Sequence, residues 1–117
     1  MKNLAKHKIA VKTREVLVQA IYQHLFEKTS SQEILEQFKK EHRSEKVDFK
    51  RFKLCLDELI KDNEAIEKTI SKKMEIKENE IELIDKAILC LGIIEMNNEM
   101  APRPVVIDEC IRLTKKF

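Results

Sequence analysis

Turn-forming residues are scarce in this 117-residue sequence, which contains one glycine and two prolines. Strands joined by tight hairpins depend on such residues, so a β-rich fold is disfavoured. No apolar run approaches the roughly 20 residues that a membrane-spanning helix requires. Lysine, glutamate, isoleucine and leucine dominate instead, and these residue types favour helices with charged, solvated faces. We therefore expect an all-α fold, a compact helical bundle in one domain covering residues 1–117.

Motifs for catalysis and metal binding are also missing. The sequence has no glycine-rich phosphate loop, no G-x-S-x-G and no H-E-x-x-H. The three histidines are isolated, and no cysteine or histidine pair has the spacing of zinc ligands. We therefore expect a protein that is not an enzyme, with no catalytic residues, no metal and no cofactor.

The cysteines are few, and none forms a C-x-x-C pair. Cys55, Cys90 and Cys110 are odd in number, widely spaced and surrounded by apolar neighbours. This pattern favours buried, reduced thiols, which are typical of cytoplasmic proteins. The N-terminus has lysines but no apolar segment after them, so it does not resemble a signal peptide. A cytoplasmic location is therefore expected.

Apolar residues recur at three- and four-residue spacing in successive segments, which predicts about six helices. The first is expected to begin near Ile9 and to be clear from Thr13 onward. Ser30 or Ser31 is expected to cap the second helix, and Asp48 the third.

Three further helices are expected in the second half of the chain. The fourth should begin near residues 62–63, with Ile66, Ile70 and Met74 as its apolar anchors. Residues 81–96 are apolar nearly all round, which places that helix at the centre of a bundle. Gly92 within it indicates close helix packing, since glycine costs about 1 kcal/mol against alanine in a helix. Pro104 suits the first turn of the last helix.

The basic residues are unevenly distributed, although the net charge is only +2. Residues 1–14 include no acidic residue and contain Lys2, Lys6, Lys8, Lys12 and Arg14. Such a cluster is typical of a surface that binds the phosphates of a nucleic acid, and a solubilising basic tail is the alternative. A second basic cluster at residues 39–53 is mixed with acidic residues, so we interpret it as solvated surface. Phe117 is the one aromatic residue placed to stack on an unpaired RNA base.

Three segments resemble the NusB family of transcription antitermination proteins, in the family's order and spacing. Residues 14–22, R-E-V-L-V-Q-A-I-Y, resemble its first-helix signature R-x-x-A-x-Q-A-L-Y. Residues 84–96 resemble its central helix, in which an acidic–basic pair is followed by A-x-L-R-x-A-x-x-E-L. Residues 102–117 resemble its P-x-x-V-A-I-N-E-A-I-E-L-A-K-x-F stretch. Residues 27–60 match the family only in helical pattern.

The resemblance implies an all-helical fold of two small subdomains and a role in transcription antitermination. It implies an RNA-binding factor that acts on the boxA element of ribosomal RNA leader transcripts. The implied partner is NusE, a small-subunit ribosomal protein, and the complex joins RNA polymerase. By resemblance, RNA would bind Lys12, Arg14 and Phe117, whereas NusE would contact Tyr22 and Asp85. On the charge argument, Lys2, Lys6 and Lys8 would join the RNA-binding surface.

Family members continue beyond the position of Phe117 with a further helix. This chain is therefore expected to be C-terminally truncated relative to the family. The loss of that helix is expected to expose an apolar strip along residues 84–94 and 106–113. A homodimer would be one way to cover such a strip.

Two other functions compete with RNA-dependent antitermination. A protein–protein adaptor with the same fold would keep the Tyr22 and Asp85 surface and bind RNA weakly or not at all. A DNA-binding helix-turn-helix protein needs a basic recognition helix, whereas residues 57–85, around the candidate turns near residues 62 and 79, carry ten carboxylates against five lysines. Lys12 and Arg14 are both expected on the surface, so replacing them should weaken RNA binding and leave folding little changed.

Overall fold

The computed structural model of the chain describes residues 2–73 and 81–117. These residues form six helices: α1 (Lys2–Glu27), α2 (Ser31–Glu41), α3 (Phe49–Lys61), α4 (Asn63–Lys73), α5 (Leu83–Asn97) and α6 (Arg103–Lys116). No strand occurs among the described residues, and the prediction of an all-α fold is confirmed. None of the described helices is both long enough and apolar enough to cross a membrane. The predicted anchor Met74 lies outside the described residues.

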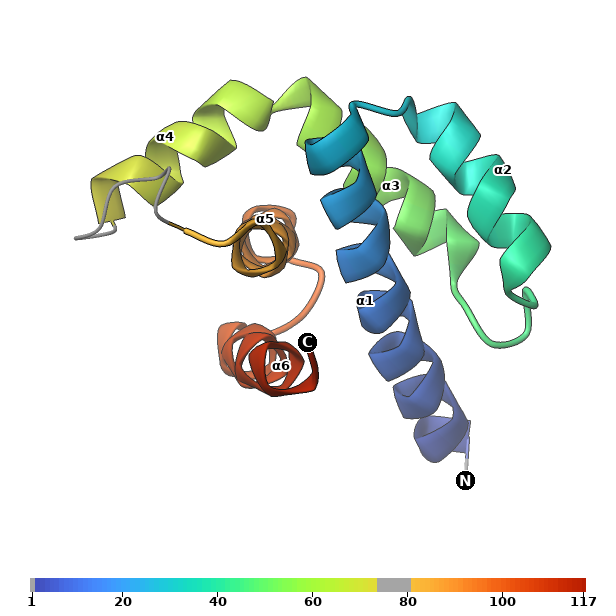
Figure 1. The fold of residues 1–117 in the computed structure, drawn as a ribbon. Helices are drawn as coiled ribbons and strands as arrows, with labels where there is room; N and C mark the ends of the chain where they lie inside the picture. Colours follow the sequence, from blue (N-terminus) through green and yellow to red (C-terminus); the bar gives the residue numbers. More distant parts are fainter. Residues whose placement is uncertain (1, 74–80) are drawn as a thin grey trace.

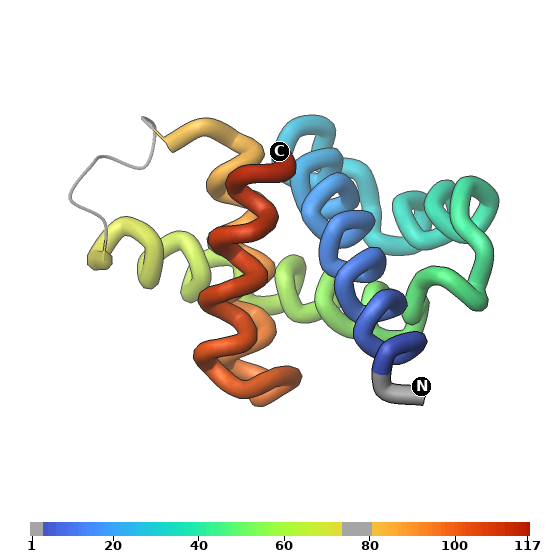
Figure 2. Tube along the Cα trace, turned by 90° about the horizontal axis from the view of Figure 1, so that it is seen from below, coloured from blue at the N-terminus to red at the C-terminus, as the bar shows by residue number. Residues whose placement is uncertain are grey.

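Helix α1 lies between two groups of helices (Figure 1). Helices α2 and α3 pack on one side of it, and α5, backed by α6, packs on the other (Figures 1 and 2). Helix α4 continues from α3 and reaches over towards α5. Because α1 is covered from both sides, the consecutive residues Val16, Leu17 and Val18 are all at most 1% exposed.

The start of α1 differs from its prediction, because the helix begins at Lys2 and not near Ile9. Leu4 is more than half exposed, so these first turns have no buried face and no apolar periodicity. Residues of this segment are mostly good helix formers, without glycine or proline. Extending a helix that is already packed adds a hydrogen bond for each residue fixed, without a new nucleation cost. The helix therefore runs on beyond the core.

The predicted helix caps are confirmed. The Ser30 hydroxyl accepts a hydrogen bond of 3.2 Å from the backbone N–H of Glu33 at the start of α2. The Asp48 carboxylate accepts one of 3.1 Å from the backbone N–H of Arg51 at the start of α3. Each cap satisfies a backbone donor that has no partner within the helix. Pro104 lies in the first turn of α6, as predicted.

Close packing of α5 and α6 explains the single glycine. A Cβ atom added at Gly92 would lie only 2.8 Å from the Cys110 Sγ atom. Helix α6 thus packs directly on the α5 backbone at this point, which confirms the interpretation of Gly92 as a close-packing residue. On either side of it, Ile88, Leu91 and Ile94 are buried in the core.

The predicted apolar strip is narrower than expected. On α6, Ile107 is 51% exposed and Ile111 is 50% exposed, and the two lie one turn apart. On α5, however, Ile84, Leu89 and Ile93 are partly buried because they pack against the core. The exposed apolar surface is therefore a stripe on α6 and not a surface shared by both helices.

We expect Gly92→Ala to destabilise the protein by about 1 kcal/mol. Overpacking against Cys110 costs about 1–3 kcal/mol, and the better helix propensity of alanine offsets about 1 kcal/mol of this. In a Cys110→Ala background the same change should be neutral or stabilising, because the obstructing sulfur is gone. Urea unfolding of the four proteins measures the coupling. An equal effect of Gly92→Ala in both backgrounds would contradict this explanation.

Candidate nucleic-acid interface

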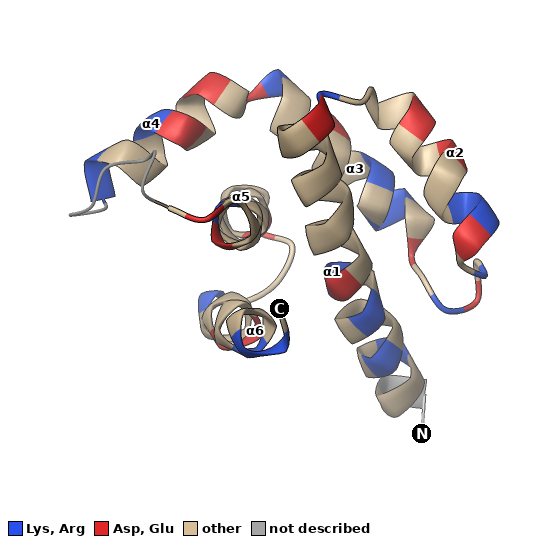
Figure 3. Ribbon diagram, viewed as in Figure 1, with Lys and Arg blue, Asp and Glu red and all other residues tan. Residues whose placement is uncertain are grey.

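The N-terminal half of α1 presents a basic surface. The side chains of Lys6, Lys8 and Lys12 are exposed, and the first turn of α1 contains no acidic residue. Lys8 and Lys12 are four residues apart and therefore share a face of the helix. Figure 3 shows this basic segment at the end of α1 that extends beyond its neighbours. Lys2 belongs to the first turn of α1, but its side chain lies outside the described part.

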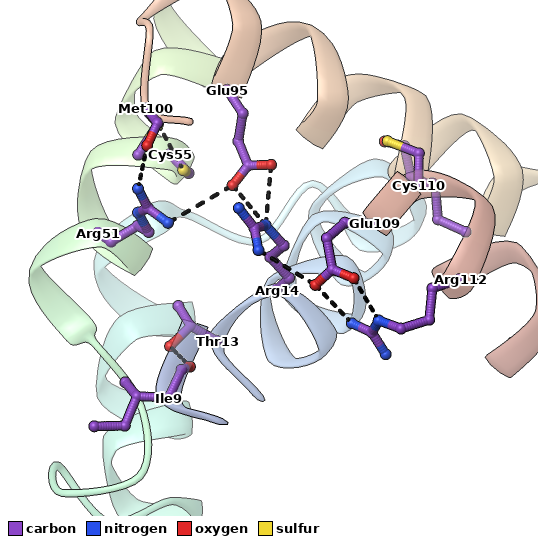
Figure 4. A network of polar contacts seen from close by, with 11 residues as sticks. Ile9, Thr13, Arg14, Arg51, Cys55, Glu95, Met100, Glu109, Cys110 and Arg112 are labelled. Atoms are coloured by element: carbon purple, nitrogen blue, oxygen red, sulfur yellow. Dashed lines mark hydrogen bonds and ion pairs between the residues drawn. The ribbon is translucent and has the colours of Figure 1, made fainter. Parts of the chain in front are cut away.

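The expectation that Arg14 lies on the surface is wrong, because Arg14 is only 4% exposed. Its Nε atom donates to both carboxylate oxygens of Glu95, at 2.9 and 3.2 Å, and its Nη1 atom lies 3.2 Å from Glu109 Oε1 (Figure 4). Arg14 precedes Leu17 and Val18 by one turn and therefore lies on the face of α1 that enters the core. Its guanidinium is committed to two carboxylates of this chain, and it is not available for RNA phosphates.

Glu95 is the most deeply buried charged residue described, with 1% of its surface exposed. Besides Arg14, it faces Arg51 of α3, whose Nη1 atom lies 3.9 Å from Glu95 Oε1. The Nη2 atom of Arg51 donates to the Met100 carbonyl oxygen at 2.8 Å. A buried carboxylate is tolerated only where cations and hydrogen bonds replace its hydration. Glu95 thus joins α1, α3 and α5 at one point.

A second part of the network connects α6 to α1. The Nε atom of Arg112 donates to Glu109 at 2.7 Å, and its Nη1 atom donates to Glu15 at 2.8 Å. Lys116 Nζ lies 3.8 Å from the same Glu15 carboxylate. These contacts hold the end of α6 beside the middle of α1. Phe117, which is exposed, follows directly and lies at this junction.

The arginines also set the ionisation of Glu109. Its partial burial by itself raises the pKa, but the hydrogen bond and charge of Arg112, followed by those of Arg14, outweigh that effect. The pKa of Glu109 therefore lies below its ordinary value of 4.5. Glu109 is charged at neutral pH and serves as the link between the two arginines.

Sequence reasoning missed this network, although one signal was present. Glu95 interrupts the most apolar segment of the chain, in the run Ile93-Ile94-Glu95-Met96. A carboxylate buried within such an apolar run requires a nearby cation. The identity of the cation could not be read from that helix, because Arg14 lies 81 residues away.

The residues predicted to face a protein partner are exposed. Tyr22 lies on the C-terminal half of α1, and its ring stacks on that of Phe26 with centroids 6.1 Å apart. Phe26 is 67% exposed, so the two rings form an aromatic patch on the surface. Asp85 is exposed in the first turn of α5. Helices α1 and α5 pack against each other, but Tyr22 and Asp85 lie on separate helices and not on one continuous segment.

Cys55, Cys90 and Cys110 are not joined by disulfide bonds, as predicted, and the first two are buried. Burial, and then the charge of Glu95, raises the pKa of Cys55 to about 12. Its Sγ atom lies 3.8 Å from the Met100 sulfur. The protonated thiol is therefore unreactive and acts as an apolar packing group. Cys110 is partly buried between α5 and α6.

In the part of the chain that the structure describes, no cluster of three His, Cys, Asp or Glu side chains is arranged to hold a metal ion.

Comparison with known proteins identifies the fold. The sequence matches the model of the NusB family over residues 11–117. It is 33% identical over 107 residues to transcription antitermination protein NusB of Psychromonas ingrahamii, which covers 91% of this chain and 74% of the relative. The chain belongs to the NusB family. It is also 35% identical over 107 residues to the NusB protein of Tolumonas auensis, which covers 91% of this chain and 78% of the relative.

Membership of the NusB family confirms the resemblance that the three sequence segments carried. NusB proteins are transcription antitermination factors and not enzymes, so the prediction of a non-enzymatic protein is also confirmed. Each of the three NusB-like segments supplies one member of the buried network, namely Arg14, Glu95 and Glu109. These NusB motif positions therefore build the inside of the bundle.

We expect Arg14→Ala to lower the free energy of unfolding by about 3–5 kcal/mol, because it leaves the buried Glu95 carboxylate without its closest cation. Lys12 lies two residues earlier, on the surface. Lys12→Ala should therefore change the free energy of unfolding by less than about 0.5 kcal/mol. Chemical denaturation followed by circular dichroism measures both. The double variant Arg14→Met, Glu95→Leu should recover much of the loss, because no buried charge stays unpaired. A double variant as unstable as Arg14→Ala would argue against the charge explanation.

Acid should weaken the Glu109 link. Because the folded pKa of Glu109 lies below its unfolded value, its contribution is complete above about pH 4.5 and is lost as the pH falls through the folded value. Wild type should therefore exceed Glu109→Gln in stability at neutral pH, and the difference should shrink as the pH falls below 4.5. Urea unfolding of both proteins across this range is the measurement. A difference that stays constant with pH would assign the effect to packing.

Proposed function

We propose that this NusB-family chain binds single-stranded RNA of the boxA type in ribosomal RNA leader transcripts, together with the ribosomal protein NusE. The observation that carries the RNA part is the exposure of Lys6, Lys8 and Lys12 on the end of α1 that extends beyond its neighbours, with Lys8 and Lys12 on one face. Lysines at such a surface neutralise phosphates and release counterions, which favours binding of a polyanion. The complex would reach RNA polymerase through the nascent transcript and NusE.

Phe117 supplies an aromatic ring near this basic segment. It is exposed, and the preceding residue Lys116 lies 3.8 Å from Glu15 of α1. Glu15 is three residues, about one helical turn, from Lys12 along α1, so the end of α6 adjoins the basic segment. Bases of single-stranded RNA stack on exposed aromatic side chains. A strand that follows the lysines would have a stacking partner at the end of α6.

The burial of Arg14 changes the expected character of the RNA contact. The remaining cations are lysines, which act as point charges, whereas arginine can hold a phosphate with two parallel hydrogen bonds. The contact should therefore be strongly salt-dependent and read little sequence by itself. Sequence preference and additional affinity would come from the partner protein.

The stacked pair Tyr22 and Phe26 supports the partner part of the proposal. Aromatic residues are enriched in the buried centres of protein interfaces because they bury a large area with little loss of conformational freedom. The same pair also favours the second candidate function, a protein–protein adaptor with weak or no RNA binding. Asp85 stays a predicted partner contact, and a homodimer through the α6 stripe of Ile107 and Ile111 also stays a prediction.

The RNA proposal is tested by fluorescence anisotropy with a labelled boxA RNA at several salt concentrations. Lys8→Ala, Lys12→Ala should weaken binding and reduce the slope of log K against log salt by about 1.4, because each phosphate contact to a single strand contributes about 0.7. The matched control is Lys68→Ala, Lys72→Ala on α4, which removes the same charge at exposed positions elsewhere. The control should leave the slope unchanged.

Addition of NusE distinguishes the two candidate functions. RNA-dependent antitermination requires tighter boxA binding in the presence of NusE, and Tyr22→Ser should abolish that increase without changing binding of RNA alone. Binding of NusE without any enhancement of RNA binding would favour the adaptor. Equal slopes for wild type and the Lys8, Lys12 variant would exclude α1 as the RNA surface.

A further inference from the structure

A groove separates the N-terminal half of α1 from the segment that joins α2 to α3. One part, with a volume of about 530 Å³, is lined by Lys6, Ile9, Ala10 and Val47, among others. An adjoining part of about 870 Å³ lies over the end of α2, beside Lys40 and Arg43. Ser44 and Phe49 line both parts, so we describe them together as the loop groove. Each of the two parts has a volume in the range of ligand-binding clefts.

The shape of the loop groove is set by a buried threonine. The Thr13 hydroxyl donates to the Ile9 carbonyl oxygen at 2.7 Å and accepts from the Asp48 backbone N–H at 2.9 Å. Thr13 is fully buried, and Val47 beside the joint is buried as well. The joining segment is therefore fastened to α1 at the edge of the groove.

The floor of the loop groove is apolar and includes an aromatic ring. Ile9 and Ala10 contribute from α1, and Phe49 contributes from the first turn of α3. The Phe49 ring meets the fully buried Phe52 edge-on, with centroids 5.5 Å apart. This contact fixes the ring, while Phe49 as a whole stays partly exposed. A fixed, partly exposed aromatic ring is a stacking platform.

The rim of the loop groove carries cations from both basic clusters of the sequence. Lys6 stands on the α1 side, and the exposed Lys39, Lys40 and Arg43 stand on the other. Three carboxylates are present too, so the four rim cations leave a net positive charge, and two of the carboxylates form hydrogen bonds within the chain. The Asp48 carboxylate caps α3, and the Glu41 carboxylate accepts a hydrogen bond from Gln37. Glu45 is the third.

We propose that the loop groove is a second RNA-binding segment, which extends the RNA path from α1 across Phe49 to Lys40 and Arg43. This inference rests on the proposed function, since it names where the same RNA continues. Phosphates would lie on the rim cations, and one unpaired base would stack on Phe49. The occupant is single-stranded, because bases paired in a duplex do not present their faces to an aromatic floor. The basic cluster at residues 39–53, which the sequence indicated only as solvated surface, thus acquires a role.

The test compares two RNAs on the full chain: a boxA RNA, and the same RNA extended by several nucleotides at either end. The longer RNA should bind more tightly to wild type. The double variant Lys40→Ala, Arg43→Ala should remove that gain and lower the salt slope for the longer RNA by about 1.4. It should leave binding of the shorter RNA unchanged. The control Lys68→Ala, Lys72→Ala should retain the gain in full.

Stacking is tested separately with Phe49→Leu, which keeps an apolar side chain on Phe52. This variant should bind the extended RNA about tenfold more weakly with an unchanged salt slope, because stacking is not ionic. Thermal unfolding verifies that the variant is folded. Ultraviolet crosslinking of the extended RNA to wild type, followed by mass spectrometry of the peptides, should identify the peptide that contains Phe49.

The outcomes separate this inference from the function on which it rests. Suppose that the double variant Lys8→Ala, Lys12→Ala weakens RNA binding, but the double variant Lys40→Ala, Arg43→Ala behaves as the α4 control does. The groove proposal is then overturned, and the α1 surface stands. If wild type binds neither RNA, with or without NusE, the proposed function itself fails. An acidic peptide could also compete with the extended RNA and remove its gain in affinity. If it does so, and no crosslink forms at Phe49, the groove is assigned to a protein partner and the groove proposal is overturned as well.

Discussion

The buried contact of Arg14 with Glu95 and Glu109 is the constraint on which the rest of the structure depends. It joins α1, α5 and α6, and Arg51 adds α3 to the same point. Buried charges contribute little net stability when paired, but separating them is costly. Any alternative packing that slides one of these helices leaves a charge unpaired in the core. The network therefore penalises such shifted packings, in addition to the apolar contacts of the core.

This constraint divides α1 into two halves with different tasks. From Thr13 onward the helix packs between its neighbours and supplies its core residues, while Tyr22 and Phe26 on its remaining face stay exposed. Before Thr13 it carries Lys6, Lys8 and Lys12 to the surface, and no neighbouring helix covers them. The rigid half holds the basic half in a fixed direction relative to Phe117 and the loop groove. An RNA strand would therefore meet a surface that is already arranged, which lowers the entropic cost of binding.

Local signals in the sequence predicted the helices and their caps well. Ser30 and Asp48 cap the helices for which they were proposed, and Gly92 packs where α6 approaches. These features depend on a few neighbouring residues, so the sequence is sufficient to find them. The start of α1 was placed too late, because the residues before Ile9 have no buried face and therefore no periodicity. Prediction from apolar spacing fails where a helix leaves the core.

The sequence by itself determined the fold class, the helix boundaries within the core and membership of the NusB family. Only the tertiary structure decided which basic residues face solvent. Lys12 and Arg14 are two positions apart in one basic run, yet one is exposed and the other is buried against Glu95. Burial depends on which face of α1 meets α5 and α6, and the partner carboxylates come from distant segments. Charge can be read from a sequence, whereas the environment of a charge is a property of the packed chain.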